Sequence, residues 1–149
     1  MTGRAAPSIT AERGNVRITI DNPANAPAPA GPYSQVARID LGTGALLVLS
    51  GQVALDEEND AAFPGDVAAQ SEAIFEAIGQ LLAAHGAGFA DIVNIRTFLT
   101  DMNDRAGYAA VRAKYLTGTL PTSTTVEVSR LFKDGAVIEI EVTAAVAGD

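Results

Sequence analysis

The stretch from residue 136 to residue 146 reads AVIEIEVTAAV, and its alternation decides the fold class. In a strand, Ile138 and Ile140 point to one side of the sheet. Glu139 and Glu141 point to the opposite side. A strand with one apolar and one polar side requires cover on only one face of its sheet.

The same alternation predicts five further strands earlier in the chain. They are Val16–Ile20, Tyr33–Asp40, Ala45–Val53, Ile92–Thr100 and Thr124–Ser129. The segment Asp21–Pro32 contains four prolines and predicts an extended connector, because proline cannot continue a ladder or a helix. Leu41–Gly44 predicts a glycine-containing hairpin loop between two of the strands.

Two amphipathic helices are predicted between these strands. The clearer one runs from about Asp66 to His85, with Asp66 as N-cap and Gly86 as the left-handed residue after its end. A second helix is predicted from about Asn103 to Leu116. His85, at the end of the first helix, is expected to cap carbonyl groups or to pack.

The element order β-β-β-α-β-α-β-β predicts an α+β fold, with a mixed sheet of about six strands and two helices on one face. We expect residues 1–14 to be a loose leader and residues 15–149 to be a single domain. The second face of the sheet has no predicted cover. It therefore favours a homo-oligomer with polar clefts between its copies.

Composition excludes several classes of function. The 149 residues include no cysteine, so disulfides, thiolate metal sites and cysteine nucleophiles are absent. A formal net charge of −8 disfavours nucleic acid, whose binding depends on cationic side chains. No apolar run reaches the roughly 20 residues that cross a bilayer. We expect a cytoplasmic protein that requires no metal and no cofactor.

Five segments between about Asp21 and Val146 carry a resemblance to the RidA (YjgF) family. They are Gly31-Pro32-Tyr33-Ser34-Gln35, Ser50-Gly51-Gln52, the region from Asp91 to Asp104, the region from Pro121 to Val128, and Ile138-Glu139-Ile140-Glu141. The resemblance implies a chorismate mutase-like fold and a homotrimer with small-molecule clefts between subunits. It also implies hydrolysis of reactive enamines and imines, such as 2-aminoacrylate, to 2-oxo acids and ammonia.

The resemblance also assigns site residues. Tyr33 and Glu139 are the candidate catalytic residues, and Gly51 is the candidate backbone donor to the substrate. Ser123 stands where deaminating members of the family have an arginine that clamps the substrate carboxylate, and Thr125 lies two residues further on. A hydroxyl offers a carboxylate one neutral hydrogen bond, whereas a guanidinium offers two charged ones.

Three interpretations of Ser123 remain open. The substrate lacks the carboxylate, another cation replaces the clamp, or catalysis has been lost. Arg96 is the candidate replacement because alternation places it on the polar face, although a solvated or interface ion pair is the simpler interpretation. Glu127 is a candidate to raise the pKa of Glu139, since we expect the two glutamates to share a face and a register near direct opposition would bring their charges close. Two solvated sheet glutamates are the simpler interpretation.

The leading hypothesis is therefore a hydrolase of a reactive imine, enamine or related electrophile other than the standard 2-imino acids. A noncatalytic trimer that binds a metabolite is the alternative. A ribonuclease or translation inhibitor, an activity also described for the family, is a third hypothesis that the acidic charge disfavours.

Overall fold

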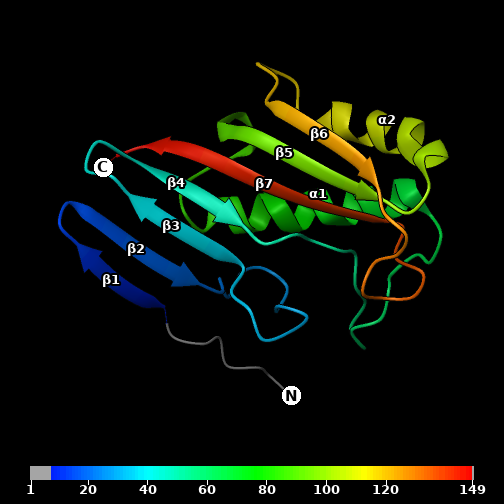
Figure 1. The fold of residues 1–149 in the computed structure, drawn as a ribbon, viewed down its shortest axis with the longest axis horizontal. Helices are drawn as coiled ribbons and strands as arrows, with labels where there is room; N and C mark the ends of the chain where they lie inside the picture. Colours follow the sequence, from blue (N-terminus) through cyan, green and yellow to red (C-terminus); the bar gives the residue numbers. More distant parts are fainter. Residues whose placement is uncertain (1–7, 149) are drawn as a thin grey trace.

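The computed structural model describes residues 8–148, which form one sheet with two helices (Figure 1). The strand order is β1-β2-β3-β4-β7-β5-β6, and only β5 and β6 run parallel. The strands are β1 (Ile9–Arg13), β2 (Val16–Asp21), β3 (Val36–Asp40), β4 (Gly44–Leu49), β5 (Ile92–Leu99), β6 (Thr122–Glu127) and β7 (Ile138–Ala147). The α+β class with a mixed sheet is confirmed, with seven strands where about six were expected.

The additional strand is β1, which lies in the segment expected to be a loose leader. Ile9–Arg13 pairs antiparallel with β2, and Gly14, with φ of +64°, forms the turn between them. All five residues of β1 are exposed. Backbone pairing therefore holds this strand without a buried side, which corrects the expectation for this part of the leader; residues 1–7 lie outside the described residues.

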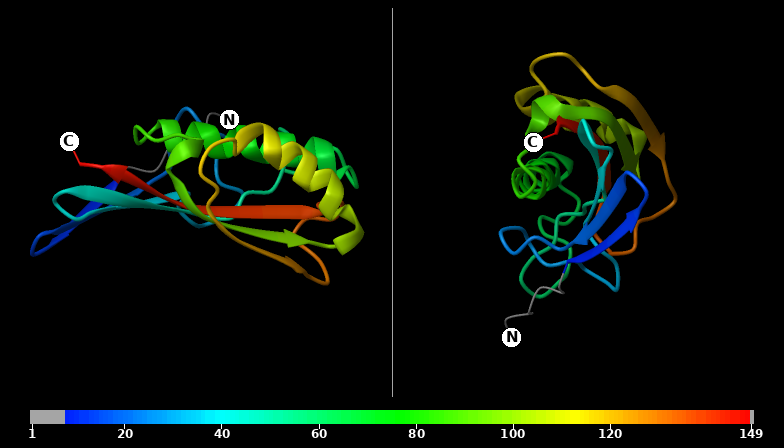
Figure 2. Two further views of the ribbon diagram at one scale, coloured as in Figure 1. Left: turned by 90° about the horizontal axis from the view of Figure 1, so that it is seen from above. Right: turned by 90° about the vertical axis from the view of Figure 1, so that its left-hand side faces the viewer.

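The two helices are α1 (Val67–Ala83) and α2 (Arg105–Tyr115), and both cover the same face of the sheet (Figure 2). Asp66 caps α1 as predicted, since its carboxylate accepts a hydrogen bond from the N–H of Ala69 at 3.0 Å. Gly86 has φ of +72°, which confirms the predicted left-handed residue after the helix. Short 3-10 turns, Phe89–Asp91 and Met102–Asp104, precede β5 and α2.

The core lies between α1 and the central strands. Phe75 of α1 is fully buried and stacks on Tyr115 of α2, with ring centroids 4.9 Å apart. The other large buried side chains in this layer are Leu47, Ile74, Ile78, Leu81, Leu82, Ile95, Leu99, Ile138 and Ile140. The packing ties both helices to the same sheet face and leaves the opposite face without a helix.

Strand β7 occupies the centre of the sheet, between β4 and β5. Its predicted alternation is confirmed: Ile138 and Ile140 are buried beneath the helices. Glu139 and Glu141 therefore lie on the face that the helices do not cover.

The position of β6 corrects one expectation. This strand pairs in parallel with β5 and has no ladder with β7 among the described residues. Glu127 is aligned with Leu99, whereas Glu139 is aligned with Phe98, so the two glutamates lie on opposite faces of the sheet. The physical reason is the crossover through α2, which returns the chain parallel to β5 and to its far side.

None of the helices in the described part of the chain combines the length and the apolar character that crossing a membrane requires.

Phe75→Ala is expected to lower the free energy of unfolding by about 3–5 kcal/mol, because it removes a buried ring on which both helices pack. Urea unfolding at fixed protein concentration measures the change. Phe132→Ala is the matched control, since Phe132 is 58% exposed; we expect it to change stability by less than about 0.5 kcal/mol. Equal losses for the two variants would contradict the assignment of the core.

Candidate functional site

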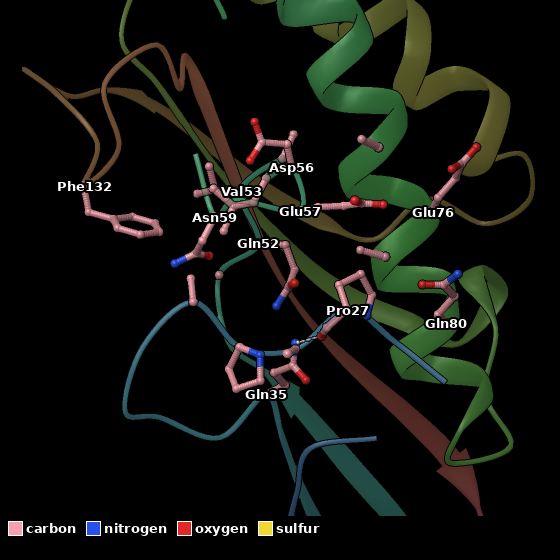
Figure 3. A pocket seen from close by; sticks show the side chains of 18 of the residues that line it. Pro27, Gln35, Gln52, Val53, Asp56, Glu57, Asn59, Glu76, Gln80 and Phe132 are labelled. Atoms are coloured by element: carbon pink, nitrogen blue, oxygen red, sulfur yellow. Dashed lines mark hydrogen bonds between the residues drawn. The ribbon is translucent and has the colours of Figure 1, made fainter. Parts of the chain in front are cut away.

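A cavity of about 670 Å³ opens between the connector before β3, the segment after β4 and helix α1 (Figure 3). Tyr33 and Gly51, two of the candidate site residues, both contribute to its wall. Gln35, Gln52, Glu76 and Phe132 also line it, from both sides of the opening. The Gly-Pro-Tyr-Ser-Gln segment, the Ser-Gly-Gln segment and α1 are separate in the sequence. All three contribute residues to the lining of this one cavity.

Hydrogen bonds between the two segments bring Tyr33 and Gly51 to this wall. The Ser50 hydroxyl donates to the carbonyl oxygen of Ser34 at 2.6 Å, and the Ser50 N–H donates to the carbonyl oxygen of Gln35 at 2.9 Å. These bonds join Ser50, which precedes Gly51, to the two residues that follow Tyr33. The loop positions are thereby set by backbone groups, which explains why two short segments act as one surface.

Glu139 lies directly against Gly51. The N–H of Gln52 donates to the carbonyl oxygen of Ile140 at 2.8 Å, and a reciprocal bond of 3.1 Å holds the segment beside β7. A Cβ on Gly51 would lie 2.8 Å from Oε1 of Glu139 and 3.0 Å from its Cδ. A side chain at this position would force the carboxylate to move from where it lies.

The pKa of Glu139 is raised above the ordinary value of a glutamate. Partial burial is the larger cause, because it penalises the charged carboxylate, and the negative charge of Glu141 is the second cause. Glu127 was the predicted source of this effect, and that prediction is wrong. Its carboxylate lies on the other sheet face and accepts a hydrogen bond from the N–H of Met102 at 2.8 Å.

Tyr33 is 42% exposed, and its hydroxyl accepts a hydrogen bond from the N–H of Ala30 at 3.2 Å. Its ring folds back over Gly31, where a Cβ would come within 3.2 Å of Cε1. The connector thus closes on itself around the ring. The phenol is held at the cavity wall and keeps its own proton available for donation, since Ala30 uses it as an acceptor.

Arg96 lies on the same sheet face as Glu139, as the alternation of β5 predicted. Its Nε is 2.8 Å from Oε1 of Glu141, its register partner on β7. The guanidinium is therefore engaged in a partly exposed ion pair, which agrees with the simpler of the two interpretations considered for this residue.

Ser123 and Thr125 lie elsewhere. They are aligned with Ile95 and Thr97 of β5, so they share the helix-covered face and not the face of Glu139. Together they line a second cavity of about 390 Å³ between β6 and α2. Within one chain, the structure does not bring these two residues together with Tyr33, Gly51 and Glu139.

Sequence reasoning missed Arg112 of α2, which lies in this second cavity. Its Nη1 donates to the Ser123 hydroxyl at 2.8 Å and makes a longer contact of 3.4 Å with the Tyr108 hydroxyl. The signal was the four-residue spacing between Tyr108 and Arg112, which places both on one helix face.

His85 lies away from both of these cavities. The Nε2 of His85 is 3.2 Å from a carboxylate oxygen of Asp21, and the residue lines neither of the two cavities. In residues 8–148, no group of three or more histidine, aspartate or glutamate side chains is placed to hold a metal ion.

Comparison with known proteins adds a family to this geometry. Residues 23–146 match a family profile described as Endoribonuclease L-PSP. Protein DfrA of Myxococcus xanthus is 40% identical over 119 residues, which cover 80% of this chain and 88% of that protein. The 2-iminobutanoate/2-iminopropanoate deaminase of Mus musculus is 34% identical over 119 residues, which cover 80% of this chain and 84% of that protein.

Solved structures agree with the observed fold. The Rid-family protein YyfA of Yersinia pestis, of unknown function, superposes with a TM-score of 0.75 at 34% identity, covering 87% of this chain and 99% of that one. The YjgF gene product of E. coli superposes with a TM-score of 0.66 at 36% identity, covering 80% and 92%.

A double-mutant cycle tests the contact between Gly51 and Glu139. Gly51→Ala is expected to cost about 1–3 kcal/mol of unfolding free energy, because the new methyl group displaces the carboxylate. In a Glu139→Ala background the same change is expected to cost about 0.5 kcal/mol or less. Urea unfolding of the four proteins measures the coupling. Additive costs would show that the carboxylate does not occupy this position.

Proposed function

The chain belongs to the RidA (YjgF) family, and on this premise we propose that it hydrolyses a reactive imine, enamine or related electrophile with Glu139 as general base. The observation that carries the proposal is the glutamate itself: a partly buried carboxylate of raised pKa that lies against Gly51. Gly51 in turn lines the cavity that Tyr33 also lines. A general base works best when its pKa lies near the working pH.

The proposed reaction converts an imine carbon and water into a carbonyl group and ammonia. An enamine is first protonated on carbon, which gives the same iminium ion. Glu139 removes a proton from water as its oxygen bonds to the iminium carbon. Glu139 passes that proton to nitrogen. It then accepts the hydroxyl proton as the carbonyl forms and the C–N bond breaks, and ammonia leaves with both electrons of that bond. Gly51 N–H would stabilise the oxygen, and the Tyr33 hydroxyl would orient the water.

We propose a homotrimer in which the sheet face without helices meets neighbouring copies, with small-molecule clefts at the subunit boundaries. Val48 and Val126 support this assembly, because both are large apolar side chains that are about 40% exposed in the single chain. Covering such residues against another copy would remove apolar surface from water.

The proposal names the class of the electrophile and no single compound. The relatives named as deaminases act on 2-imino acids, which carry a carboxylate. Ser123 offers that carboxylate a single neutral hydroxyl, so binding of a 2-imino acid depends on a cation at another position. The noncatalytic metabolite-binding trimer remains the alternative function. The ribonuclease reading is disfavoured by the net charge of −8.

Glu139→Gln is expected to lower imine hydrolysis at least about 100-fold, because the amide cannot accept the proton of water. The substrates are 2-iminopropanoate, 2-iminobutanoate and a neutral aliphatic imine, generated in the assay and followed by their trapping with semicarbazide. Glu127→Gln is the matched control on the other sheet face and should retain the wild-type rate. Sedimentation should give the same assembly for all three proteins.

Full activity of Glu139→Gln would contradict the assignment of the base. A wild-type protein that accelerates none of these imines, yet binds their 2-oxo acid products, would favour the noncatalytic alternative.

The pH dependence provides a further test. Hydrolysis is expected to rise with pH as Glu139 loses its proton, with a midpoint above the ordinary pKa of a glutamate. The kcat/KM profile of the wild-type protein measures this limb. A midpoint in the ordinary carboxyl range would contradict the proposal that the raised pKa of Glu139 serves its role as general base.

A further inference from the structure

We propose that Arg112 binds the anionic group of the ligand, and that the cavity between α2 and β6 is a subsite for a small carboxylate with a short apolar chain. The inference rests on the proposed function in taking this carboxylate to be part of the substrate. Its physical basis is a preorganised guanidinium whose charge is not matched by any carboxylate of residues 8–148.

The lining of the cavity combines cationic and apolar side chains. Arg105 and Arg112 lie seven residues apart on one face of α2, and both line the cavity. Its apolar lining is Ala109, Ala113, Leu116 and Leu120. At about 390 Å³ the space is large enough for a small carboxylate with a short apolar chain.

Arg112 has no carboxylate partner among residues 8–148. Arg17, Arg38, Arg96 and Lys114 each have a carboxylate within ion-pair distance, whereas Arg13, Arg105, Arg112, Arg130 and Lys133 have none among residues 8–148. Of these five, Arg112 is the one whose guanidinium donates to neutral hydroxyl groups. Arg105 and Arg112 bring two positive charges to a cavity that no acidic side chain of the described residues lines, which gives it a local positive potential. An oxyanion is the ligand that such a pair recognises.

Hydrogen bonds hold Arg112 in position before any ligand arrives. The Thr97 hydroxyl bonds to the Tyr108 hydroxyl at 2.7 Å, and both residues are buried. Nη1 of Arg112 contacts Tyr108 on one side and Ser123 on the other. A guanidinium has five N–H donors, so this arrangement uses Nη1 for orientation and leaves Nη2 and Nε free for a carboxylate. Preorganisation lowers the entropic cost of binding.

The same contacts give a physical meaning to the serine at position 123. Its short side chain lets a guanidinium from α2 reach β6, whereas a long side chain there would occupy that space. Of the three interpretations of Ser123, the replacement of the clamp by another cation is therefore the one that this geometry favours. The replacing residue is Arg112 and not Arg96, whose Nε is engaged with Glu141.

Arg112 and Glu139 act on one ligand only between two copies. In a single chain the cavity of Arg112 lies on the helix-covered side of the sheet, and Glu139 lies on the opposite side. A substrate of a few carbon atoms cannot span both within one chain. Because β6 is an edge strand, the cavity of Arg112 opens at the edge of the sheet. The inference therefore adds to the proposed homotrimer that this edge of one copy meets the uncovered sheet face of its neighbour, so that one copy supplies the anion subsite and the other the base.

Calorimetric titration with 2-oxobutanoate, and with neutral 2-butanone as isostere, tests the inference. We expect the wild-type protein to prefer the anion, and Arg112→Gln to weaken its binding by about 30-fold or more. Arg112→Lys should restore part of the affinity, because it returns the charge without the planar fork. Binding of 2-butanone should be the same in all variants.

Arg96→Gln is the matched control, since it removes an arginine on the other sheet face and should leave the affinity for 2-oxobutanoate unchanged. Loss of anion binding in Arg96→Gln, or its retention in a folded Arg112→Gln, would overturn the inference. So would equal affinity of the wild-type protein for the anion and its neutral isostere. Circular dichroism and sedimentation establish whether each variant folds. If Arg112→Gln misfolds, the affinities of Arg112→Lys and Ser123→Ala for 2-oxobutanoate test the inference instead, because both variants keep a long cationic side chain in the cavity.

Glu139→Gln separates this inference from the proposed function. We expect that variant to bind 2-oxobutanoate as the wild-type protein does while failing to hydrolyse imines. If the protein binds the anion through Arg112 but hydrolyses no imine, the subsite is supported and the proposed reaction is contradicted. If it hydrolyses imines at the same rate with and without Arg112, the reaction is supported and the subsite is contradicted.

Discussion

The alternation of β7 is the constraint on which the rest of the molecule depends. A central strand paired on both edges has no freedom of register, because a shift by one residue would bury two glutamates and expose two isoleucines. Ile138 and Ile140 meet the helices. Glu139 is thereby committed to the opposite face, where Gly51 leaves room for its carboxylate. The side chains on one face of β7 belong to the core, and Glu139 on its other face belongs to the candidate site.

This arrangement carries a cost to stability. The folded protein raises the pKa of Glu139 above its ordinary value, so it holds this proton more tightly than the unfolded chain does. The penalty is absent below the ordinary pKa, where both states are protonated. It grows as pH rises and is complete above the folded pKa, so this group lowers stability near neutral pH. A carboxylate that destabilises the fold where the protein works is consistent with a functional role.

Sequence reasoning reached those features that local chemistry determines. The cap at Asp66, the turn at Gly86 and the alternation of β7 each follow from neighbouring residues. It failed where partners are distant. Alternation relates the faces of residues within one strand but does not fix how separate strands are aligned, so Glu127 and Glu139 were placed on one face although they lie on opposite faces. Strand β1 was not predicted because all of its residues are exposed and none forms an apolar side. Arg112 was not predicted because its contact with Ser123 depends on the packing of α2 against β6.

The central claim is that the fold makes Glu139 a base, and the titration of its carboxyl carbon tests this most directly. Carbon-13 NMR of protein labelled at glutamate side chains, with Glu139→Gln to assign the signal, follows that group alone. The account predicts a midpoint above the ordinary glutamate pKa that coincides with the midpoint of the hydrolysis profile. A signal that titrates in the ordinary range, independent of the activity profile, would contradict it.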